Sequence, residues 1–481
     1  MATTTRSGGR ADGKTPGGKG GKGGSGGGND SGGGKPGSRA ARYAVVGGVL
    51  LALLAGCGGI TAGILASEGY LPGDSMRQVW ETPVDDHVPG PTSGHGTWAV
   101  GDTLVRSRAT EVTGFDARSG ARRWRYAPAG DAAVCSVSRT AEDGVALIAQ
   151  GSPETPGGEP AAAAGKGCTT VVALDLGSGR ELWRAARTPA SGEIQDEKDL
   201  VAVGGGLAVV RDEDPDWPYA WAGERPGSVR PDRALRALDL RTGKPRWAAA
   251  VPKDCVPHRV AAGQRQVLAL LVCERRDVRL AAFDPADGRH RWTTPLDERR
   301  YVEPIVNEAA FLSADPIAVS VDGLDLSGYP SVLSFSDDGR LQGRIASDVA
   351  NGRLSTAEPA HAEIAYGRLY AVDALSRDTV SAFDLRTGRR LWHARLGYAE
   401  DVLGLRVADG RVTALVDLYA HSAEDGLLVL DADTGEERDM RTFPDSFGGS
   451  FGEITDVLGH GNLLIAARTD GFRPFTAYEE R

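Results

Sequence analysis

The chain has 481 residues, of which 41% are hydrophobic and 25% charged, as is usual for a soluble globular body. Its net charge of −10 is unevenly spread: residues 1–42 hold eight basic and two acidic residues, so the remainder is strongly acidic. An acidic body argues against nucleic acid as a partner, because phosphate binding needs a basic surface. Arginine supplies almost all of the positive charge, a bias typical of a GC-rich, actinobacterial-like genome.

Residues 1–42 form a low-complexity tail of Gly, Lys and Ser, including the run GGKGGKGGSGGG. Such a segment lacks the apolar residues that a core requires, so we predict a disordered cytoplasmic tail. Its basic residues also leave open an attraction to anionic lipid headgroups.

Residues 43–66 are uncharged and apolar, and their 24 residues exceed the roughly 20 that a helix needs to cross a bilayer. Arg39 and Arg42 lie just before this span, and the next basic residue is Arg77. The positive-inside rule therefore predicts a cytoplasmic N-terminus and an extracytoplasmic body, joined by a short linker at 67–75. The cell membrane is accordingly an expected partner.

The same span allows a second interpretation, based on Leu54-Ala55-Gly56-Cys57. This tetrapeptide resembles a bacterial lipobox, in which Cys57 would be lipidated and become the new N-terminus. The long leader and the apolar sequence that continues to Ala66 favour an uncleaved anchor instead. Both interpretations place the body outside the cytoplasm.

From residue 76 onward, short stretches of alternating apolar residues are separated by Gly and Asp turns. Thr170–Leu176 and Arg368–Ala374 are examples. This pattern predicts β-strands, and the sequence contains no long amphipathic helix. We therefore predict one all-β domain over residues 76–481.

A repeated motif, A-x-D-x-x-[ST]-G-x-x-x-W, recurs through this domain. The first copy has Gly where the pattern has Ala, a later copy keeps Asp431, Thr434 and Gly435 but has Asp439 in place of Trp, and another keeps only the turn at Asp338-Gly339. The turn glycines are 45 to 64 residues apart, which suits one four-stranded blade per copy. They are Gly120, Gly179, Gly243, Gly288, Gly339, Gly388 and Gly435.

The chemistry of the motif is structural. Asp ends a strand and can accept hydrogen bonds from amides of the turn. Gly supplies the positive φ that a tight hairpin requires. Trp begins the next strand and buries a large ring that carries one N–H.

The motif resembles the tryptophan-docking motif of the pyrroloquinoline quinone (PQQ) repeat over residues 76–481. The resemblance implies an eight-bladed, quinoprotein-like β-propeller in which each Trp packs between adjacent blades. It is specific for the fold but not for the cofactor. The docking candidates are Trp80, Trp124, Trp183, Trp247, Trp292 and Trp392.

The eighth blade needs strands from both ends of the chain. Seven motif hairpins account for seven blades, and three further strands follow, at Ile454–Leu458, Leu463–Arg468 and Phe475–Tyr478. The segment Gln78–Pro83, which contains Trp80, is similar to the outer strands of the other blades. We predict that this N-terminal strand completes the last blade and closes the ring.

The longest insertions, Gly151–Gly167 and Asp212–Asp232, fall between the second and third strands of their blades. We therefore expect a protein or glycan partner on this B–C loop face. Asp212, Asp214 and Asp216 alternate as in a calcium loop, but the glycine and the bidentate Glu of such a loop are missing, which favours a solvated acidic loop. Trp217, Tyr219 and Trp221 follow and can either contact a partner or fold back onto the blade.

Four cysteines lie in the extracytoplasmic body, where disulfides persist. Cys255 lies in a link between blades and Cys273 at the end of a second strand, and the antiparallel pairing of these strands favours a Cys255–Cys273 bond. A Cys135–Cys168 bond is also plausible. Cys255-x-x-His258 alone is too small a set for a metal site.

Catalytic signatures are weak. Gly448-x-Ser450-x-Gly452 matches a hydrolase pattern but lacks the strand before it and the helix after it. Quinone dehydrogenases that resemble this repeat carry an adjacent Cys–Cys pair, which is missing here, so the chain looks closer to non-catalytic scaffold relatives. We expect a binding or protein-interaction scaffold without a cofactor. The alternatives are a PQQ- and calcium-dependent dehydrogenase and an extracellular ligand sensor.

Overall fold

The structure is a computed structural model, and it describes residues 76–85, 94–130, 132–152, 167–187, 199–212, 235–274, 277–298, 301–302, 307–323, 330–348, 350–356, 359–397, 399–418, 425–443, 454–468 and 473–480. The predicted tail, membrane span, linker and Cys57 lie outside these ranges, as do Asp214, Asp216 and the Gly448–Gly452 pattern. No helix within the described ranges is long and apolar enough to cross a membrane.

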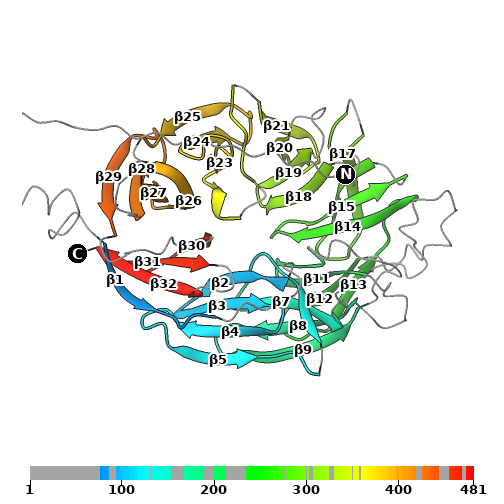
Figure 1. Cartoon of the computed structure of the whole chain (residues 1–481). Helices are drawn as coiled ribbons and strands as arrows, with labels where there is room; N and C mark the ends of the chain where they lie inside the picture. The colour runs from blue at the N-terminus through cyan, green and yellow to red at the C-terminus, as the bar shows by residue number, and fades with distance from the viewer. Residues whose placement is uncertain are drawn as a thin grey trace, which may run out of the picture. The chain divides into compact units, whose positions relative to one another are not determined.

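The described residues form eight antiparallel sheets of four strands each, and together these make an eight-bladed propeller, as predicted. Figure 1 shows the blades around a common centre, with β14, β18, β26 and β30 inside and β5, β9, β25 and β29 outside.

The first four blades run from the innermost strand outward in chain order. They are β2 (Gly96–Val100), β3 (Thr103–Arg108), β4 (Glu111–Asp116) and β5 (Arg122–Tyr126); β6 (Ala133–Val137), β7 (Val145–Ser152), β8 (Gly167–Asp175) and β9 (Arg180–Ala186); β10 (Val201–Gly204), β11 (Leu207–Arg211), β12 (Leu235–Asp239) and β13 (Pro245–Ala249); and β14 (Cys255–Ala262), β15 (Val267–Cys273), β16 (Asp277–Phe283) and β17 (His290–Pro295).

The last four blades follow the same order, except that the eighth takes its outer strand from the N-terminal end. They are β18 (Asn307–Ala314), β19 (Ile317–Gly323), β20 (Ser331–Phe335) and β21 (Leu341–Ala346); β22 (Ala362–Ala365), β23 (Arg368–Val372), β24 (Thr379–Asp384) and β25 (Arg390–Arg395); β26 (Ala399–Ala408), β27 (Arg411–Leu418), β28 (Asp425–Asp431) and β29 (Glu437–Thr442); and β30 (Ile454–His460), β31 (Leu463–Arg468), β32 (Phe475–Glu480) and β1 (Met76–Glu81).

The middle strands are buried on both faces because adjacent blades cover them. Every residue of β15, with the sequence VLALLVC, is buried, whereas no residue of the outer strand β9 is fully buried. This explains why the middle strands are mostly apolar runs while the outer strands carry charge. The apolar cores therefore lie between blades; one of them joins residues of β10–β13 to residues of β14–β16.

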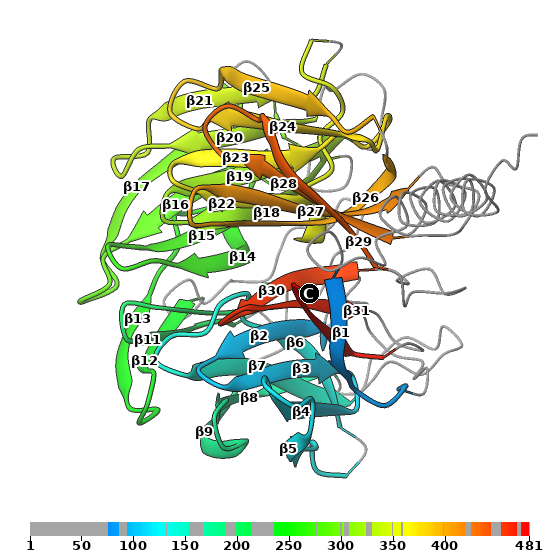
Figure 2. The same cartoon turned by 90° about the vertical axis from the view of Figure 1, so that its left-hand side faces the viewer.

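Ring closure is confirmed by the pairing of β1 with β32. Trp80 lies opposite Ala477, and Met76 lies opposite Glu480. Beyond the strand, Thr82 accepts a hydrogen bond from the Phe475 N–H at its Oγ1 (2.9 Å), and its own N–H donates to the Phe475 carbonyl (3.0 Å). Figure 2 shows β1 in the same blade as β30 and β31, and in the sheet β32 lies between β1 and β31.

A short 3₁₀ helix, η3 (Pro359–His361), precedes β22 in the link between blades 5 and 6. It contacts the innermost strands of two further blades, β26 and β30. Ala360 is buried there, and a Cβ added to Gly404 would lie 3.6 Å from the Ala360 Cβ. This link therefore reaches from blade 6 across the inner edge of blade 7 to blade 8.

Candidate functional site

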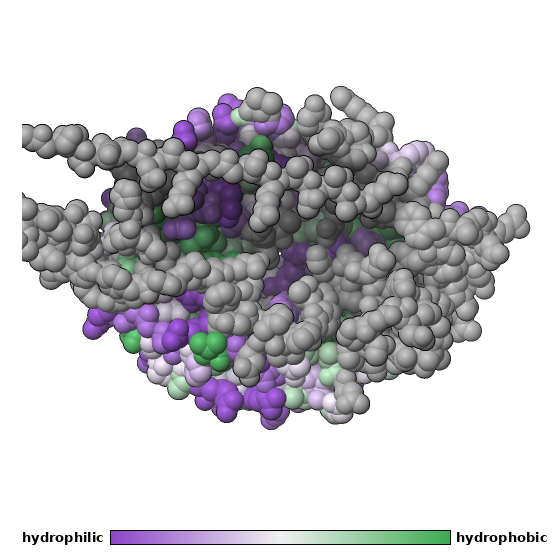
Figure 3. Space-filling view, in the orientation of Figure 1, coloured by the Kyte–Doolittle hydropathy of each residue, from purple (hydrophilic) through white to green (hydrophobic). Residues whose placement is uncertain are grey.

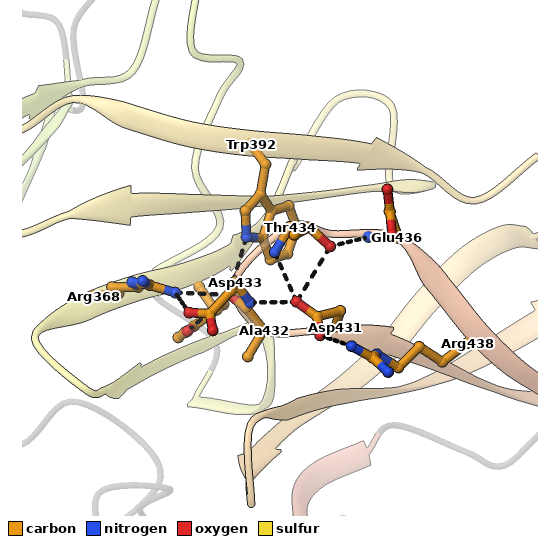
Figure 4. A network of polar contacts seen from close by, with 9 residues as sticks. Arg368, Trp392, Asp431, Ala432, Asp433, Thr434, Glu436 and Arg438 are labelled. Carbon is orange, nitrogen blue, oxygen red and sulfur yellow. Dashed lines mark hydrogen bonds and ion pairs between the residues drawn. The ribbon is translucent and has the colours of Figure 1, made fainter.

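The repeated turn is seen most completely in blade 7. The Oδ1 atom of Asp431 accepts hydrogen bonds from the N–H groups of Asp433 and Thr434, both at 2.9 Å, and from the Thr434 hydroxyl at 3.2 Å (Figure 4). Its Oδ2 atom pairs with Arg438. The Arg438 side chain, followed by the Thr434 amide, lowers the pKa of Asp431 to about 2. The carboxylate is therefore fully engaged within its own turn.

Six of the seven motif turns also receive the tryptophan of the preceding blade. The Trp392 ring lies against Gly435, where a Cβ would come within 2.5 Å of the ring, and its indole N–H donates to the Ala432 carbonyl at 3.1 Å (Figure 4). Glycine is thus required for the close approach of a ring as well as for its positive φ of 73°. The same ring-on-glycine contact joins Trp80 to Gly120, Trp124 to Gly179, Trp183 to Gly243, Trp247 to Gly288, and Trp292 to Gly339.

A recurring arginine was missed in the sequence. Arg246 donates to Asp239 at 3.0 Å, and Arg291 donates to Asp284 at 2.8 Å. The signal was available, since an Arg stands seven residues after the motif Asp, directly before the Trp position. The full set of such pairs is Asp116–Arg123, Asp239–Arg246, Asp284–Arg291 and Asp431–Arg438.

Blade 5 docks on blade 6 without a tryptophan. Gly343 occupies the Trp position and pairs with Ser334, just as Trp292 pairs with Ala282 in blade 4. The Ser334 hydroxyl donates to the Leu385 carbonyl, and Leu385 follows Asp384 as Ala432 follows Asp431. A serine hydroxyl therefore replaces the indole N–H as the donor at this junction.

Of the loop and cysteine residues predicted as sites, Asp212 and the four cysteines lie within the described ranges. Asp212 forms an ion pair with Arg236, whose Nη2 donates to Asp212 Oδ1 at 2.9 Å. Within the described ranges, no cluster of three or more His, Cys, Asp or Glu residues is suited to hold a metal ion. The structure contains disulfides between Cys255 and Cys273 and between Cys135 and Cys168, with Cα–Cα distances of 4.0 and 6.1 Å.

A group of titratable side chains lies on the innermost strands of blades 6, 7 and 8. Glu363 Oε2 accepts a hydrogen bond from the Val407 N–H at 2.5 Å. Burial raises the pKa of Glu363 to about 7, with a further increase from the charge of Asp456 and opposing effects of Val407 and Arg406. Burial likewise raises the pKa of Asp456 to about 6.

Arg406 completes this group, which we call the axial trio: Glu363, Arg406 and Asp456. A Cβ at Gly459 would lie 2.5 Å from the Arg406 Cζ, so the guanidinium rests on a residue without a side chain. One signal for this group was present in the sequence and was missed, namely single acidic residues within otherwise apolar inner strands (AEIA in β22 and ITDVLGH in β30).

The innermost part of blades 2, 3 and 4 carries the opposite charge balance. Asp199 accepts from Arg139 Nε at 2.7 Å and from Arg259 Nη1 at 3.2 Å. Burial raises the pKa of Asp199, but the charges and hydrogen bonds of these two arginines hold it below its ordinary value. Figure 3 shows hydrophilic residues in the recessed area near the centre of the ring.

One hollow, with a volume of ≈480 Å³, lies between turns of blades 4 and 5. Arg265 spans its rim and pairs with Asp315 at 2.9 Å and with Asp337 at 2.6 Å. The turns β14–β15, β18–β19 and β20–β21 that form it lie on the face opposite the B–C loops. Its lining consists of Arg265, Pro316, Ile317, Phe335, Ser336, Asp337, Asp338 and Gln342.

The PQQ_2 family model, described as Outer membrane protein assembly factor BamB, matches residues 73–360 and 340–462. Among solved structures, BamB from Moraxella catarrhalis is similar at 16% identity and a TM-score of 0.46, covering 84% of this chain and 99% of that one. The quinohemoprotein alcohol dehydrogenase ADHIIG from Pseudomonas putida HK5 has 12% identity and a TM-score of 0.45, covering 85% and 78%. Sqt1 from Saccharomyces cerevisiae has 10% identity and a TM-score of 0.47, and the match covers 85% of this chain and 99% of Sqt1. A comparison with curated proteins gave no match.

Proposed function

The chain belongs to the PQQ-repeat family described as Outer membrane protein assembly factor BamB, and we propose that it is a membrane-anchored, extracytoplasmic binding scaffold rather than a catalyst. The family supports a role in protein interaction, and the description of its model names an assembly factor.

The observation that carries this proposal is that the motif side chains are engaged in holding the propeller together. The repeated Asp, Ser or Thr and Arg residues bond one another within each turn, and the Trp residues pack and bond across blade junctions. The polar groups of the repeat therefore build the frame of the propeller. The Trp247 N–H, for example, donates to the Pro285 carbonyl of the next blade at 2.9 Å. A rigid ring of this kind is suited to present loops and turns to a partner.

The axial groups do not fit the quinone of related dehydrogenases. PQQ carries three carboxylates, which call for several cationic or neutral donors. The axial trio offers one guanidinium between two carboxyl groups, and Arg139 and Arg259 already share Asp199. We therefore derive no quinone chemistry from this chain. Purified ectodomain that oxidised an alcohol or a sugar with added PQQ and calcium would overturn the scaffold proposal.

The partner is expected on the loops at Gly151–Gly167 and Asp212–Asp232. A photo-crosslinking amino acid placed at residue 158 or 219 in intact cells should form adducts of discrete size. The same probe at the exposed Leu391 on an outer strand is the matched control and should not. Adducts from Leu391 alone would move the partner to the rim of the ring and contradict the loop assignment.

The topology can be tested independently. We expect a membrane-impermeant thiol reagent to label Arg300→Cys in intact cells and to spare Gly20→Cys, because the span at 43–66 separates them. Labelling at residue 20 alone would reverse the orientation. Mass spectrometry that found a diacylated Cys57 at the N-terminus would replace the uncleaved anchor with a lipoprotein.

A further inference from the structure

The junction between blades 7 and 8 lacks the docking device of the other junctions. Asp439 stands at the Trp position of blade 7, opposite Val429. The junction is held instead by an apolar cluster to which η3 contributes Ala360 and in which the Phe443 and Tyr478 rings lie 4.7 Å apart. The buried members of this cluster are Met76, Ala360, Leu415, Leu427, Phe443, Ile454, Val457, Ala466 and Tyr478.

The link that carries η3 acts as a strap over this junction. We define the strap as the described residues 350–356 and 359–361. Leu354 and Ala360 are buried, and η3 contacts β26 of blade 7 and β30 of blade 8. The strap leads directly into β22, on which Glu363 lies two residues after its end. The axial trio is therefore placed on the same three inner strands that the strap joins.

The axial trio has no direct ion pair within the part of the chain that the structure describes. Glu363 has the Val407 N–H as a partner, and Asp456 has the N–H of its neighbour Val457 at 2.8 Å. The charge of Arg406 lowers the pKa of both half-buried carboxyl groups, but among the described residues it forms no ion pair with either. Ionising both would leave like charges facing each other in a poorly hydrated place, which is unfavourable.

The other charged groups on the elements packed around the trio are occupied or point elsewhere. On the strap, His361 is bonded to Ser355 at 3.1 Å. On β26, Asp401 pairs with Arg377 at 2.8 Å. His460 pairs with Asp102, and Arg368 pairs with Asp433. Arg468 donates hydrogen bonds to Thr476 and Tyr478. Glu400 on β26 and Arg411 on β27 are exposed, and Asp417 on β27 is half-buried.

We propose that Glu363 and Asp456, with Arg406 between them, form a proton-operated clasp that holds the strap and the junction of blades 7 and 8 closed when protonated and loosens them when deprotonated. The proposal concerns regulation of the ring and does not depend on the scaffold function. The proton leaves a carboxyl oxygen of Glu363 or Asp456 for water, and no other co-reactant takes part.

The direction of the pH effect follows from the charge of the two carboxyl groups. When both are neutral, Arg406 is the only charge and no repulsion acts across the three strands. Raising the pH through about 6 to 7 removes protons from both, since burial has raised the pKa of each into that range. The cost of holding these buried charges, to which the charge of Asp456 adds at Glu363, then acts beside the one described junction where neither a Trp nor a hydroxyl donor holds the outer strands together.

Hydrogen–deuterium exchange of the whole chain tests the clasp. At about pH 8, compared with about pH 5, peptides covering 354–365, 399–408 and 454–460 should lose protection by about tenfold after correction for intrinsic exchange rates, the change that one pKa unit of linkage gives. Peptides covering β15 and β16, which lie far from the trio in sequence and in another blade, should keep their protection.

Variants separate the clasp from general loosening at high pH. E363Q and D456N imitate the protonated acids, so they should fold and should retain protection at about pH 8. Glu400→Gln, an exposed change on β26, is the matched control and should behave as the wild-type protein. Equal loss of protection in wild type and E363Q/D456N would overturn the clasp. If the double variant failed to fold, calorimetric unfolding of the wild type in buffers of different ionisation enthalpy would decide, because absence of proton release on unfolding between about pH 5 and pH 7 would reject it.

Discussion

The docking tryptophans differ in what their indole N–H bonds. Trp183 donates to the Leu240 carbonyl at 2.8 Å, whereas the buried Nε1 of Trp124 has no hydrogen-bond partner among the described residues. Both rings lie against the glycine of the next blade. The chain therefore contains a natural comparison between docking by packing alone and docking by packing with a hydrogen bond.

Substitution by phenylalanine should separate these contributions. Both W183F and W124F replace the indole by a smaller aromatic side chain, but only W183F leaves a buried carbonyl without its donor. W183F should therefore lower the free energy of unfolding by about 1 to 2 kcal/mol more than W124F does. Denaturant unfolding of the two variants measures the difference. Equal losses would mean that the indole hydrogen bond adds nothing to the junction.

Ser334 offers a second test at the scale of one atom. Ser334→Ala removes the hydroxyl that donates to Leu385 and should cost about 1 to 3 kcal/mol, because a buried carbonyl loses its partner. Ser381→Ala, at a buried position on β24, is the control and should cost less. A smaller loss in Ser334→Ala than in Ser381→Ala would show that the blade 5–6 junction is held by packing instead.

Single residues show where sequence reasoning succeeds and where it fails. The motif glycines and tryptophans could be predicted because their spacing repeats. Ser334 could not, since its role depends on a carbonyl 51 positions later that only the ring brings near. The axial trio was missed for the same reason, as its members come from three blades and follow no shared pattern.

At the scale of the element, β1 is the strand on which the whole ring depends. It is the only strand whose pairing partner lies at the other end of the described chain, with Trp80 opposite Ala477 and its ring on Gly120 of blade 1. Without β1, the edge of β32 would be unpaired and the first junction would lose its docking ring. Unpaired edges of this kind invite aggregation.

Truncation tests this dependence. A protein that starts at residue 91 should unfold at a lower temperature than one that starts at residue 73, and the loss should be cooperative over the ring because blades 8 and 1 lose their shared element. Thermal unfolding followed by circular dichroism compares the two, and deletion of residues 67–75 alone is the control that should have no effect. Identical melting of both truncated proteins would refute closure by β1.

The elements themselves were largely predictable. The number of blades followed from counting strands, because the turn residues mark each hairpin and the three unmatched C-terminal strands required a fourth. The path of the strap was not predictable. Its residues show no periodicity that would distinguish a link running over the next two blades from an ordinary loop, and the contact of Ala360 with Gly404 exists only in the closed ring.

For the whole molecule, carboxyl groups with lowered and with raised pKa values have opposite effects on how stability depends on pH. Asp199 has a lowered pKa because Arg139 and Arg259 outweigh its burial, and Asp431 is held at about 2 by Arg438 and its turn. Burial raises the pKa values of Glu363 and Asp456, and within the described ranges neither carboxyl group has an arginine ion pair to oppose it. The ring thus combines carboxylates that favour the folded state when ionised with carboxyl groups that favour it when neutral.

The dependence of stability on pH follows from these shifts with a definite sign. A raised carboxyl pKa contributes stability that is present below the unfolded value of about 4 and is lost as the pH rises through the folded values of about 6 and 7. A lowered pKa contributes stability that is present above about 4 and is lost as the pH falls toward about 2. The melting temperature of the wild-type ectodomain should therefore be highest near pH 4 to 5 and decline toward pH 8.

In E363Q/D456N the decline above pH 5 should flatten, while the fall in acid should remain, because Asp199 and Asp431 are unchanged. Asp199→Asn is the opposite control, which should weaken the fall in acid and keep the decline above pH 5. Parallel curves for wild type and E363Q/D456N between pH 5 and 8 would instead assign the decline to the net negative charge of the whole ectodomain.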